Sequence, residues 1–265
     1  MKLRLLGIAF FIILLTGCSE FQKVLKSQDY ELWYTTSMEL YEQKEYNRAS
    51  LLLSELNNIY RGTDKAENIM YVYANCLFNM RDYMMAGHYY SEFVKTFPSS
   101  QLVEECQFQS AFCYYKSSPN LRLDQDDTRK AIGEFQLFIN MFSSSPKVEE
   151  ATRLMDELRD KLVEKAFMNA KLYFDLGTYM GNNYQAAVIT AQNTLKEFPG
   201  TKHREELSFL ILESKFIQAV NSVSEKKEER VRDTIDEYYS FANEFADSKY
   251  MKKAERILKQ SEDML

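Results

Sequence analysis

The sequence predicts an all-α protein built from a series of helix-turn-helix repeats, and three observations support this fold class. Its 265 residues include only 8 Gly and 4 Pro but 18 Tyr and 18 Phe. So few helix breakers beside so many large rings favour long helices packed on aromatic side chains over a turn-rich β protein. A small residue followed by bulkier residues at +4, +7 and +11, on one face of a helix, recurs along the chain. A similar short turn follows most copies.

The N-terminus has the features of a secretory signal peptide. Lys2 and Arg4 precede an apolar run over residues 5–15, which is too short to span a bilayer. The run ends in Leu-Thr-Gly-Cys at residues 15–18. This ending is similar to the bacterial lipobox, in which cleavage precedes the cysteine and its thiol receives a lipid. We therefore expect no cofactor other than the covalent lipid on Cys18; an ordinary signal peptide with a chance cysteine is the alternative.

A lipid on Cys18 would fix the location of the mature chain. Two or three acyl chains, at about 0.8 kcal/mol per buried methylene, anchor a protein stably in a lipid bilayer. Ser19 and not Asp follows the cysteine, which by the sorting rule known for enteric bacteria favours the outer membrane. We expect a lipid-anchored protein of the outer membrane that faces the periplasm.

The mature chain is acidic. Without residues 1–17 it keeps 31 Lys plus Arg against 39 Asp plus Glu, a formal charge of −8. This charge argues against nucleic acid or an anionic membrane surface as the main partner. Contact with the bilayer is therefore expected through the acyl chains.

The sequence shows no catalytic or metal-binding signature. It has no phosphate-binding glycine loop, no GxSxG and no HExxH motif, and His88 and His203 fall in different repeats. Cys76, Cys106 and Cys113 lie among apolar residues without a CxxC pair, which predicts buried free thiols. We therefore expect neither an enzyme nor a metal site.

Five copies of the pattern mark the second helix of each repeat. After copies two to five the chain reads FPSSQL, FSSSPK, FPGTKH and FADSKY. Pro98 and Pro199 are expected to stop a helix, and the Ser or Thr that follows to cap the next one. An insertion at Ser117–Asp127 breaks the third repeat, and Asp127 is predicted to cap the helix after it. The copies are Ala49, Leu53, Leu56, Tyr60; Ala86, Tyr90, Phe93, Phe97; Ala131, Phe135, Phe138, Phe142; Ala187, Ala191, Thr194, Phe198; and Thr234, Tyr238, Phe241, Phe245.

The predicted organisation follows from these copies. A signal peptide at 1–17 and a lipidated N-terminus with a short linker at 18–27 precede the array at 28–265. The repeats are placed at about 28–63, 64–100, 101–146, 147–201 and 202–248, with a capping helix at 249–265.

The first repeats resemble the tetratricopeptide repeat, a helix-turn-helix unit of 34 residues. With Ala49 at that repeat's alanine, Trp33 falls on its tryptophan position and Ser37 on its small position. The resemblance implies an α-solenoid of about five degenerate repeats in a right-handed superhelix with a concave face. HEAT-like repeats would suit the longer spacings better, but they would not explain Trp33 or the aromatic-Pro turns.

The first helices of repeats one and two carry a second face that combines aromatic and amide side chains. In the tetratricopeptide geometry this face lines the concave groove, where it would suit a peptide with aromatic side chains. Burial of the rings by neighbouring parts of the chain is equally compatible with the pattern. The candidate groove residues are Tyr34, Met38, Tyr41, Tyr71, Asn75, Phe78 and Asn79.

The lipobox and the repeats together resemble the BamD family, lipoproteins of the machinery that inserts β-barrels into bacterial outer membranes. The most specific part is 126–174, where an Arg-x-Ala segment precedes an aromatic helix, a Ser-rich turn and a long charged helix. The chain departs from the family in a shortened insertion in repeat three and in extra residues around 177–184. The resemblance is carried by Arg129, Ala131, Phe135, Ala170, Tyr173, Ala186, Ala187 and Phe198–Thr201.

This resemblance implies a non-catalytic scaffold of the barrel-assembly (BAM) complex. Its C-terminal repeats would dock on periplasmic repeat domains of the barrel-forming subunit. Its N-terminal repeats would receive the aromatic C-terminal signal of unfolded outer-membrane β-barrel proteins. The candidate docking residues are Arg153, Arg159, Asp160 and Lys161, for which a solvated helix face is the simpler alternative. The alternative functions are another periplasmic repeat lipoprotein, such as an adaptor for pilus or envelope biogenesis, and an accessory subunit of an enzyme or an enzyme with an unrecognised site.

Overall fold

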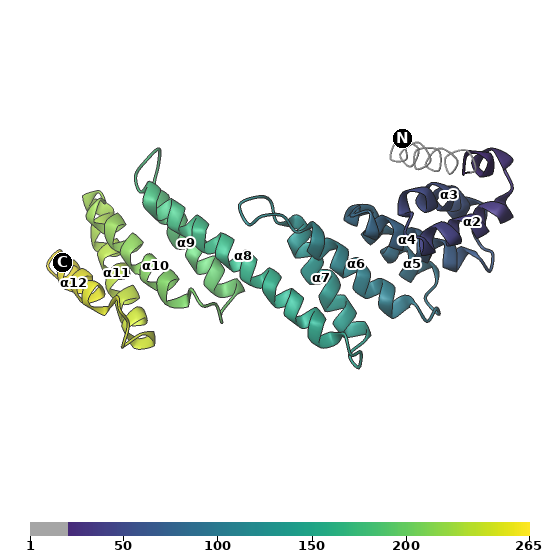
Figure 1. Ribbon diagram of the computed structural model, residues 1–265. Coiled ribbons are helices and arrows are strands. Elements are labelled where there is room, and N and C mark those ends of the chain that lie inside the picture. Colours follow the sequence, from purple (N-terminus) through teal and green to yellow (C-terminus); the bar gives the residue numbers. More distant parts are fainter. Residues whose placement is uncertain (1–20) are drawn as a thin grey trace, which may run out of the picture. The chain divides into compact units, whose positions relative to one another are not determined.

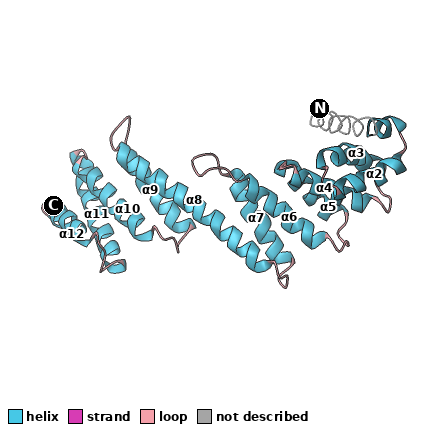
Figure 2. Ribbon diagram, viewed as in Figure 1, coloured by secondary structure: helices cyan, strands magenta, loops and turns pink. Residues whose placement is uncertain are grey.

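The computed structural model describes residues 21–265, so the predicted signal peptide and Cys18 lie outside the described residues. Within this range the chain forms helices and no strand (Figure 1, Figure 2), which confirms the predicted all-α fold of helical repeats. After a helical stretch at 21–27, the helices are α2 (Tyr30–Glu42), α3 (Tyr46–Ile59), α4 (Ala66–Asn79), α5 (Tyr83–Thr96), α6 (Val103–Ser117), α7 (Asp126–Met141), α8 (Val148–Leu176), α9 (Asn183–Glu197), α10 (Arg204–Val220), α11 (Ser224–Glu244) and α12 (Met251–Glu262).

The described chain divides into two compact units. Unit 1 contains the described residues up to Pro119 together with Gln125–Met155, and unit 2 contains Asn120–Asp124 and Asp156–Leu265. Unit 1 therefore holds α2 to α7 and the start of α8, and unit 2 holds the rest of α8 and α9 to α12. The central residues of the insertion belong to unit 2, where the Lys165 ammonium donates a hydrogen bond to the carbonyl oxygen of Leu123.

The recurring pattern has the structural role that the sequence predicts. The small residue is fully buried in all five copies, where a side chain of larger volume would keep the neighbouring helix away. The residue at +11 is the C-cap of the second helix and donates its backbone N–H to the carbonyl oxygen four residues earlier. The small residues are Ala49, Ala86, Ala131, Ala187 and Thr234. The C-cap residues are Tyr60, Phe97, Phe142, Phe198 and Phe245.

Contrary to the prediction, the Ser and Thr residues of three of the turns do not cap the helices that follow them, α6, α10 and α12. No side-chain hydrogen bond caps α6, α10 or α12, and Asp127 lies inside the first turn of α7 instead of at its N-cap. Ser100 accepts a hydrogen bond from the Leu102 backbone within the turn and donates one to Glu67 at 2.6 Å. The hydroxyl therefore ties the turn to the first helical turn of its own repeat, in α4. The same link joins Ser145 to Glu104 and Ser248 to Glu205.

The first helices of unit 1 follow one another in a 37-residue register. Ser37, Ala74 and Ala111 are spaced by 37 residues and are all fully buried, so α2, α4 and α6 allow close packing at the same place. Trp33 is buried, and its indole N–H donates to the carbonyl oxygen of Val24 at 2.8 Å. These three helices carry the candidate functional face described below.

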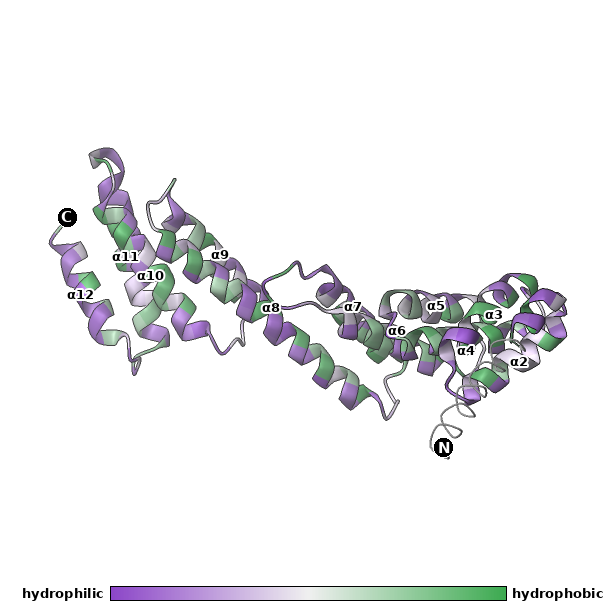
Figure 3. Ribbon diagram, turned by 45° about the horizontal axis from the view of Figure 1, so that its top comes forward, coloured by the Kyte–Doolittle hydropathy of each residue, from purple (hydrophilic) through white to green (hydrophobic). Residues whose placement is uncertain are grey.

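The core of unit 2 forms between α8, α9, α10, α11 and α12. Ala170 of α8 packs in one cluster with residues of α9 and α10, and Phe209 of α10 packs in a second cluster with Ile257 of α12. The ring of Phe209 stacks on Tyr250 with the centroids 4.4 Å apart. In Figure 3 hydrophilic and hydrophobic residues alternate along α8 and α11, as expected for helices with a buried side.

Candidate functional site

The predicted groove residues lie on α2 and α4 of unit 1, and the structure brings the two sets together. The Asn68 amide of α4 donates to the Tyr34 hydroxyl oxygen at 3.0 Å and lies 3.5 Å from the Met38 sulfur. Asn79 is exposed, and its amide donates to the carbonyl oxygen of Asn75. The other side chains are held on one side by the core and reach solvent on the other. The half-buried members are Tyr34, Met38, Tyr41, Tyr71 and Phe78.

Asn75 is fixed by two tyrosines. Its Oδ1 accepts a hydrogen bond of 2.5 Å from the Tyr90 hydroxyl, and it also hydrogen-bonds to the hydroxyl of Tyr41. Burial raises the pKa of Tyr90, so its hydroxyl stays a neutral donor. Burial, with the nearby Tyr71, also raises the pKa of Tyr41. Because its amide is engaged on both sides, Asn75 positions the Tyr41 ring.

The aromatic surface continues onto α6, which the sequence prediction did not include. The Phe78 ring stacks on Phe112 with centroids 6.1 Å apart, and Phe112 stacks on Tyr115 at 5.7 Å. The 37-residue register could have found both rings, because Phe112 and Tyr115 follow Asn75 and Phe78 by 37 residues. The surface formed by Tyr34, Met38, Tyr41, Tyr71, Phe78, Phe112 and Tyr115 is referred to below as the aromatic face.

Two ammonium groups lie over rings of the aromatic face. The Lys65 ammonium is 4.8 Å from the Tyr34 centroid and 2.6 Å from the Glu31 carboxylate. Their hydrogen bond is the main reason why the pKa of Lys65 is raised and that of Glu31 is lowered. The Lys116 ammonium lies 4.9 Å from the Phe112 centroid and is exposed. Cations so placed interact with the electron-rich ring faces and leave positive charge beside them.

The four predicted docking residues are spread around α8. Arg153 and Asp160 are seven residues apart and share an exposed side of the helix. Arg159 is half-buried and pairs with Asp156 at 3.2 Å. Lys161 is half-buried, and burial lowers its pKa. Arg153 belongs to unit 1 and the other three to unit 2, and their docking role stays a prediction.

The three described cysteines are buried free thiols, as the sequence predicts. Burial raises the pKa of Cys76, Cys106 and Cys113 to about 12, so each stays protonated and weakly nucleophilic at neutral pH. Over residues 21–265 no group of His, Cys, Asp and Glu side chains is suited to hold a metal ion.

His203 joins α8 to α10 in unit 2. Its ring stacks on Phe167 with centroids 4.1 Å apart. Its Nε2 lies 2.8 Å from the Glu164 carboxylate, and its Nδ1 lies 3.2 Å from that of Glu206. These hydrogen bonds are the main reason why the pKa values of both carboxyl groups are lowered. The arrangement is a structural link between two helices.

A comparison with protein families places the aromatic face in a known context. A family model named YfiO and described as outer membrane lipoprotein matches residues 26–181, which is more than half of the chain and includes the whole aromatic face. The chain belongs to this outer membrane lipoprotein family. The match confirms the predicted kinship with the BamD family and the prediction of an outer membrane lipoprotein. A comparison with curated proteins found no match.

Family membership assigns the chain to the outer membrane. The acylation site at Cys18 lies outside the described residues and stays a prediction, as does the orientation toward the periplasm. None of the helices between residues 21 and 265 has both the length and the apolar character needed to cross a bilayer.

Proposed function

We propose that this chain is a non-catalytic, lipid-anchored scaffold of the machinery that assembles β-barrel proteins in the outer membrane. Membership of the outer membrane lipoprotein family supports this role. The lipid on Cys18 would hold the chain at the membrane. The aromatic face of unit 1 would receive the aromatic C-terminal segment of unfolded barrel proteins, and α8 would contribute to docking of the barrel-forming subunit through the periplasmic repeat domains of that subunit.

The aromatic face is the observation that carries the proposal. Its rings are held in place by the core and by neighbouring rings, so a ligand would order few side chains on binding. Aromatic rings are favoured anchors in binding sites because they bury a large area with few rotatable bonds. The exposed Lys116 ammonium would complement the free carboxylate of a C-terminal segment.

Depletion of the protein in its own bacterium tests the assembly role. We expect the levels of outer-membrane β-barrel proteins to fall, because their insertion would lose its scaffold, while lipoproteins without a barrel stay at their normal levels. Re-expression of the unchanged chain is the control and should restore the barrels. Normal barrel levels after depletion would contradict the proposal and favour an adaptor for pilus or envelope biogenesis.

The anchor and the docking helix can be tested by fractionation and affinity purification. Cys18→Ser should release the protein from the membrane fraction, because the acyl chains would be lost.

The unchanged chain should co-purify with a large barrel protein that carries periplasmic repeat domains. Arg153→Glu combined with Asp160→Lys should reduce that yield, whereas the exposed pair Lys252→Glu with Glu255→Lys on α12 should not. Equal yields from both swaps would remove Arg153 and Asp160 from the docking surface.

A further inference from the structure

Helix α8 is apolar on two opposite sides, and in unit 2 the core covers one of them. Phe167 and Ala170 pack in a cluster with residues of α9 and α10. On the other side Met168, Leu172 and Leu176 follow one another every four residues and are 38%, 55% and 38% exposed. A surface helix normally carries polar residues on its outer side. Folding of unit 2 therefore does not explain this row, which is referred to as the α8 stripe.

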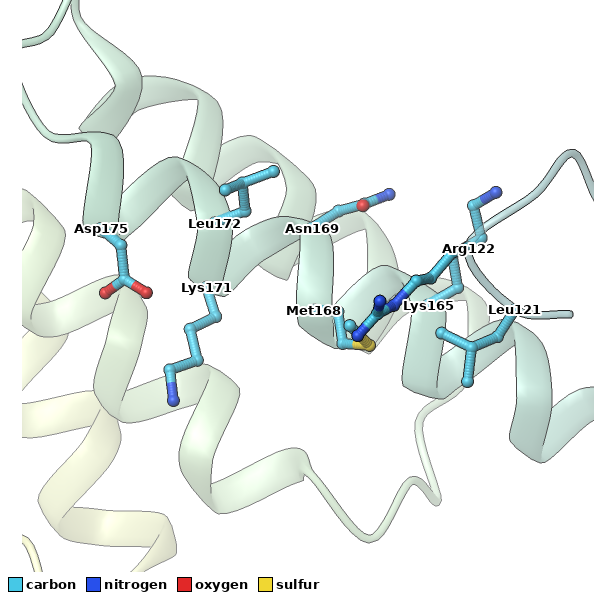
Figure 4. Close-up of a pocket in the computed structure, with 8 residues that line it drawn as sticks. All are labelled: Leu121, Arg122, Lys165, Met168, Asn169, Lys171, Leu172 and Asp175. Atoms are coloured by element: carbon cyan, nitrogen blue, oxygen red, sulfur yellow. The ribbon is translucent and has the colours of Figure 1, made fainter.

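The insertion turns part of the α8 stripe into a pocket. Asn120–Asp124 belongs to unit 2 and is fastened to α8 by the hydrogen bond from Lys165 to the Leu123 carbonyl. Leu121 and Arg122 line one side of a pocket of about 390 Å³, and α8 supplies the rest of its lining. Figure 4 shows the Arg122 side chain extending from the insertion toward Met168. This volume lies within the range of about 300–1,000 Å³ that is usual for binding pockets.

The charge of the pocket is opposite to that of the chain. Its lining contains three cations, Arg122, Lys165 and Lys171, against one carboxylate, Asp175. The whole chain has a formal charge of −6. An apolar centre surrounded by positive side chains attracts a partner with an apolar anchor and acidic neighbours, and repels basic segments.

We propose that this pocket is a docking site for an acidic segment of a partner protein. One bulky apolar side chain of that segment inserts between Leu121, Met168 and Leu172, and flanking Asp or Glu residues meet Arg122 and Lys171. The proposal rests on the proposed function in one respect, because the partner is then a protein of the assembly machinery. It assigns a docking role to the insertion and to the second half of α8, away from Arg153 and Asp160.

A protein partner fits this geometry better than a lipid surface. A helix that binds a bilayer interface lies with its apolar side flat against the acyl chains. Here the insertion forms a wall beside the α8 stripe, and Asp175 lies in the lining. A narrow segment can enter such a pocket, whereas a planar bilayer surface cannot.

Site-specific photo-cross-linking of the full-length lipidated protein in its own bacterium tests the proposal. A photoreactive phenylalanine derivative replaces Leu172, and in a matched control it replaces Tyr239 on α11, which is 57% exposed and lies outside the pocket. We expect a discrete protein adduct from position 172 and none from position 239. Mass spectrometry of the adduct should find a cross-linked segment with an excess of Asp and Glu around an apolar residue.

Charge reversal supplies the second measurement. Arg122→Glu with Lys171→Glu should lower the adduct yield about tenfold, the effect of losing complementary charge at a docking site. The control Lys252→Glu with Lys259→Glu changes the net charge equally on the exposed side of α12 and should leave the yield unchanged. Circular dichroism checks that both variants fold.

Four results would overturn the proposal. These are no adduct above the Tyr239 control, an adduct with lipid alone, a cross-linked segment without an acidic excess, and a yield that charge reversal does not change. Depletion separates this failure from failure of the proposed function. If barrel levels fall on depletion but position 172 gives no adduct, only the docking site is wrong; if the acidic adduct forms but barrel levels stay normal, the proposed function is wrong.

Discussion

In unit 1 the half-buried rings of the aromatic face are supported by the fold, whereas in unit 2 the exposed α8 stripe has no such support. Phe78 stacks on Phe112, and Asn75 of α4 links Tyr90 of α5 to Tyr41 of α2. Leu172 on α8 is 55% exposed and belongs to neither of the two core clusters described for unit 2.

The difference shows two ways in which a repeat protein can present an apolar surface. The aromatic face is completed by folding, so its shape exists before a ligand arrives and binding loses little conformational entropy. In the proposed docking, the α8 stripe gains its packing only when a partner binds. The stability of unit 1 should therefore depend on residues beneath its surface, whereas unit 2 should tolerate changes in its stripe.

The largest expected effect is a difference in stability: replacing a ring of the core should cost far more free energy of unfolding than replacing a residue of the α8 stripe. Phe93→Ala removes a fully buried ring that lies beside Tyr71 and Phe97 and should lower the free energy of unfolding by about 3–5 kcal/mol. Leu172→Ala should change it by less than about 0.5 kcal/mol. Urea denaturation measures both. A loss for Leu172→Ala comparable to that for Phe93→Ala would show that the stripe is part of the folded core.

A smaller loss of stability is expected when the hydrogen bond that links the aromatic face to the core is removed. Tyr90→Phe removes the donor to Asn75 Oδ1 and leaves that oxygen unpaired, which should reduce the free energy of unfolding by about 1–3 kcal/mol. Tyr239→Phe is the control, because Tyr239 is exposed. Thermal unfolding compares the two variants, and equal melting temperatures would mean that the Asn75 link does not hold the face.

The smallest expected effect is a pH dependence of the stability of unit 2. The hydrogen bonds with His203 lower the pKa values of Glu164 and Glu206 below the ordinary 4.5. The stabilisation from these carboxylates is therefore complete above pH 4.5 and is lost as the pH falls through their folded-state pKa values. Because both side chains are about one third exposed, the loss should stay below about 1 kcal/mol.

Unfolding of the His203→Gln variant measures this contribution. The variant should lose less stability than the unchanged protein when the pH is lowered from about 6 to about 3. Lys95→Gln, which breaks the exposed pair with Glu92 in unit 1, is the control and should leave the contribution of Glu164 and Glu206 in place. Identical acid sensitivity of the His203→Gln variant and the unchanged protein would contradict the role of His203.

Much of the fold could be predicted from the sequence because its strongest signals are local. The +11 aromatics, from Tyr60 to Phe245, end their helices as predicted, since the same few residues set the helix face and the turn. The seven candidate groove residues were predicted from the second helix face of repeats one and two, and the 37-residue register extended once more leads to Phe112 and Tyr115.

Features that depend on contacts between helices could not be predicted in this way. The Ser100 hydroxyl can cap the next helix or bind the first helix of its own repeat. Only the folded structure, in which it donates a hydrogen bond of 2.6 Å to Glu67, decides between the two. The engagement of Asn75 by Tyr90 likewise joins two helices. The α8 stripe could not be predicted, because a helical pattern shows which residues share a side of a helix. It does not show which of two apolar sides the core of the protein covers.

The affinity of the intact protein for a peptide that ends in an aromatic residue tests the central claim most directly. Fluorescence anisotropy with a labelled C-terminal segment of an outer-membrane barrel protein measures it, and the same segment without its terminal aromatic residue is the control peptide. Tyr71→Ala combined with Phe78→Ala should weaken binding about tenfold or more, whereas Leu172→Ala should not. Unchanged affinity of a folded Tyr71→Ala, Phe78→Ala variant would show that these rings only pack, and would contradict the assignment of the aromatic face.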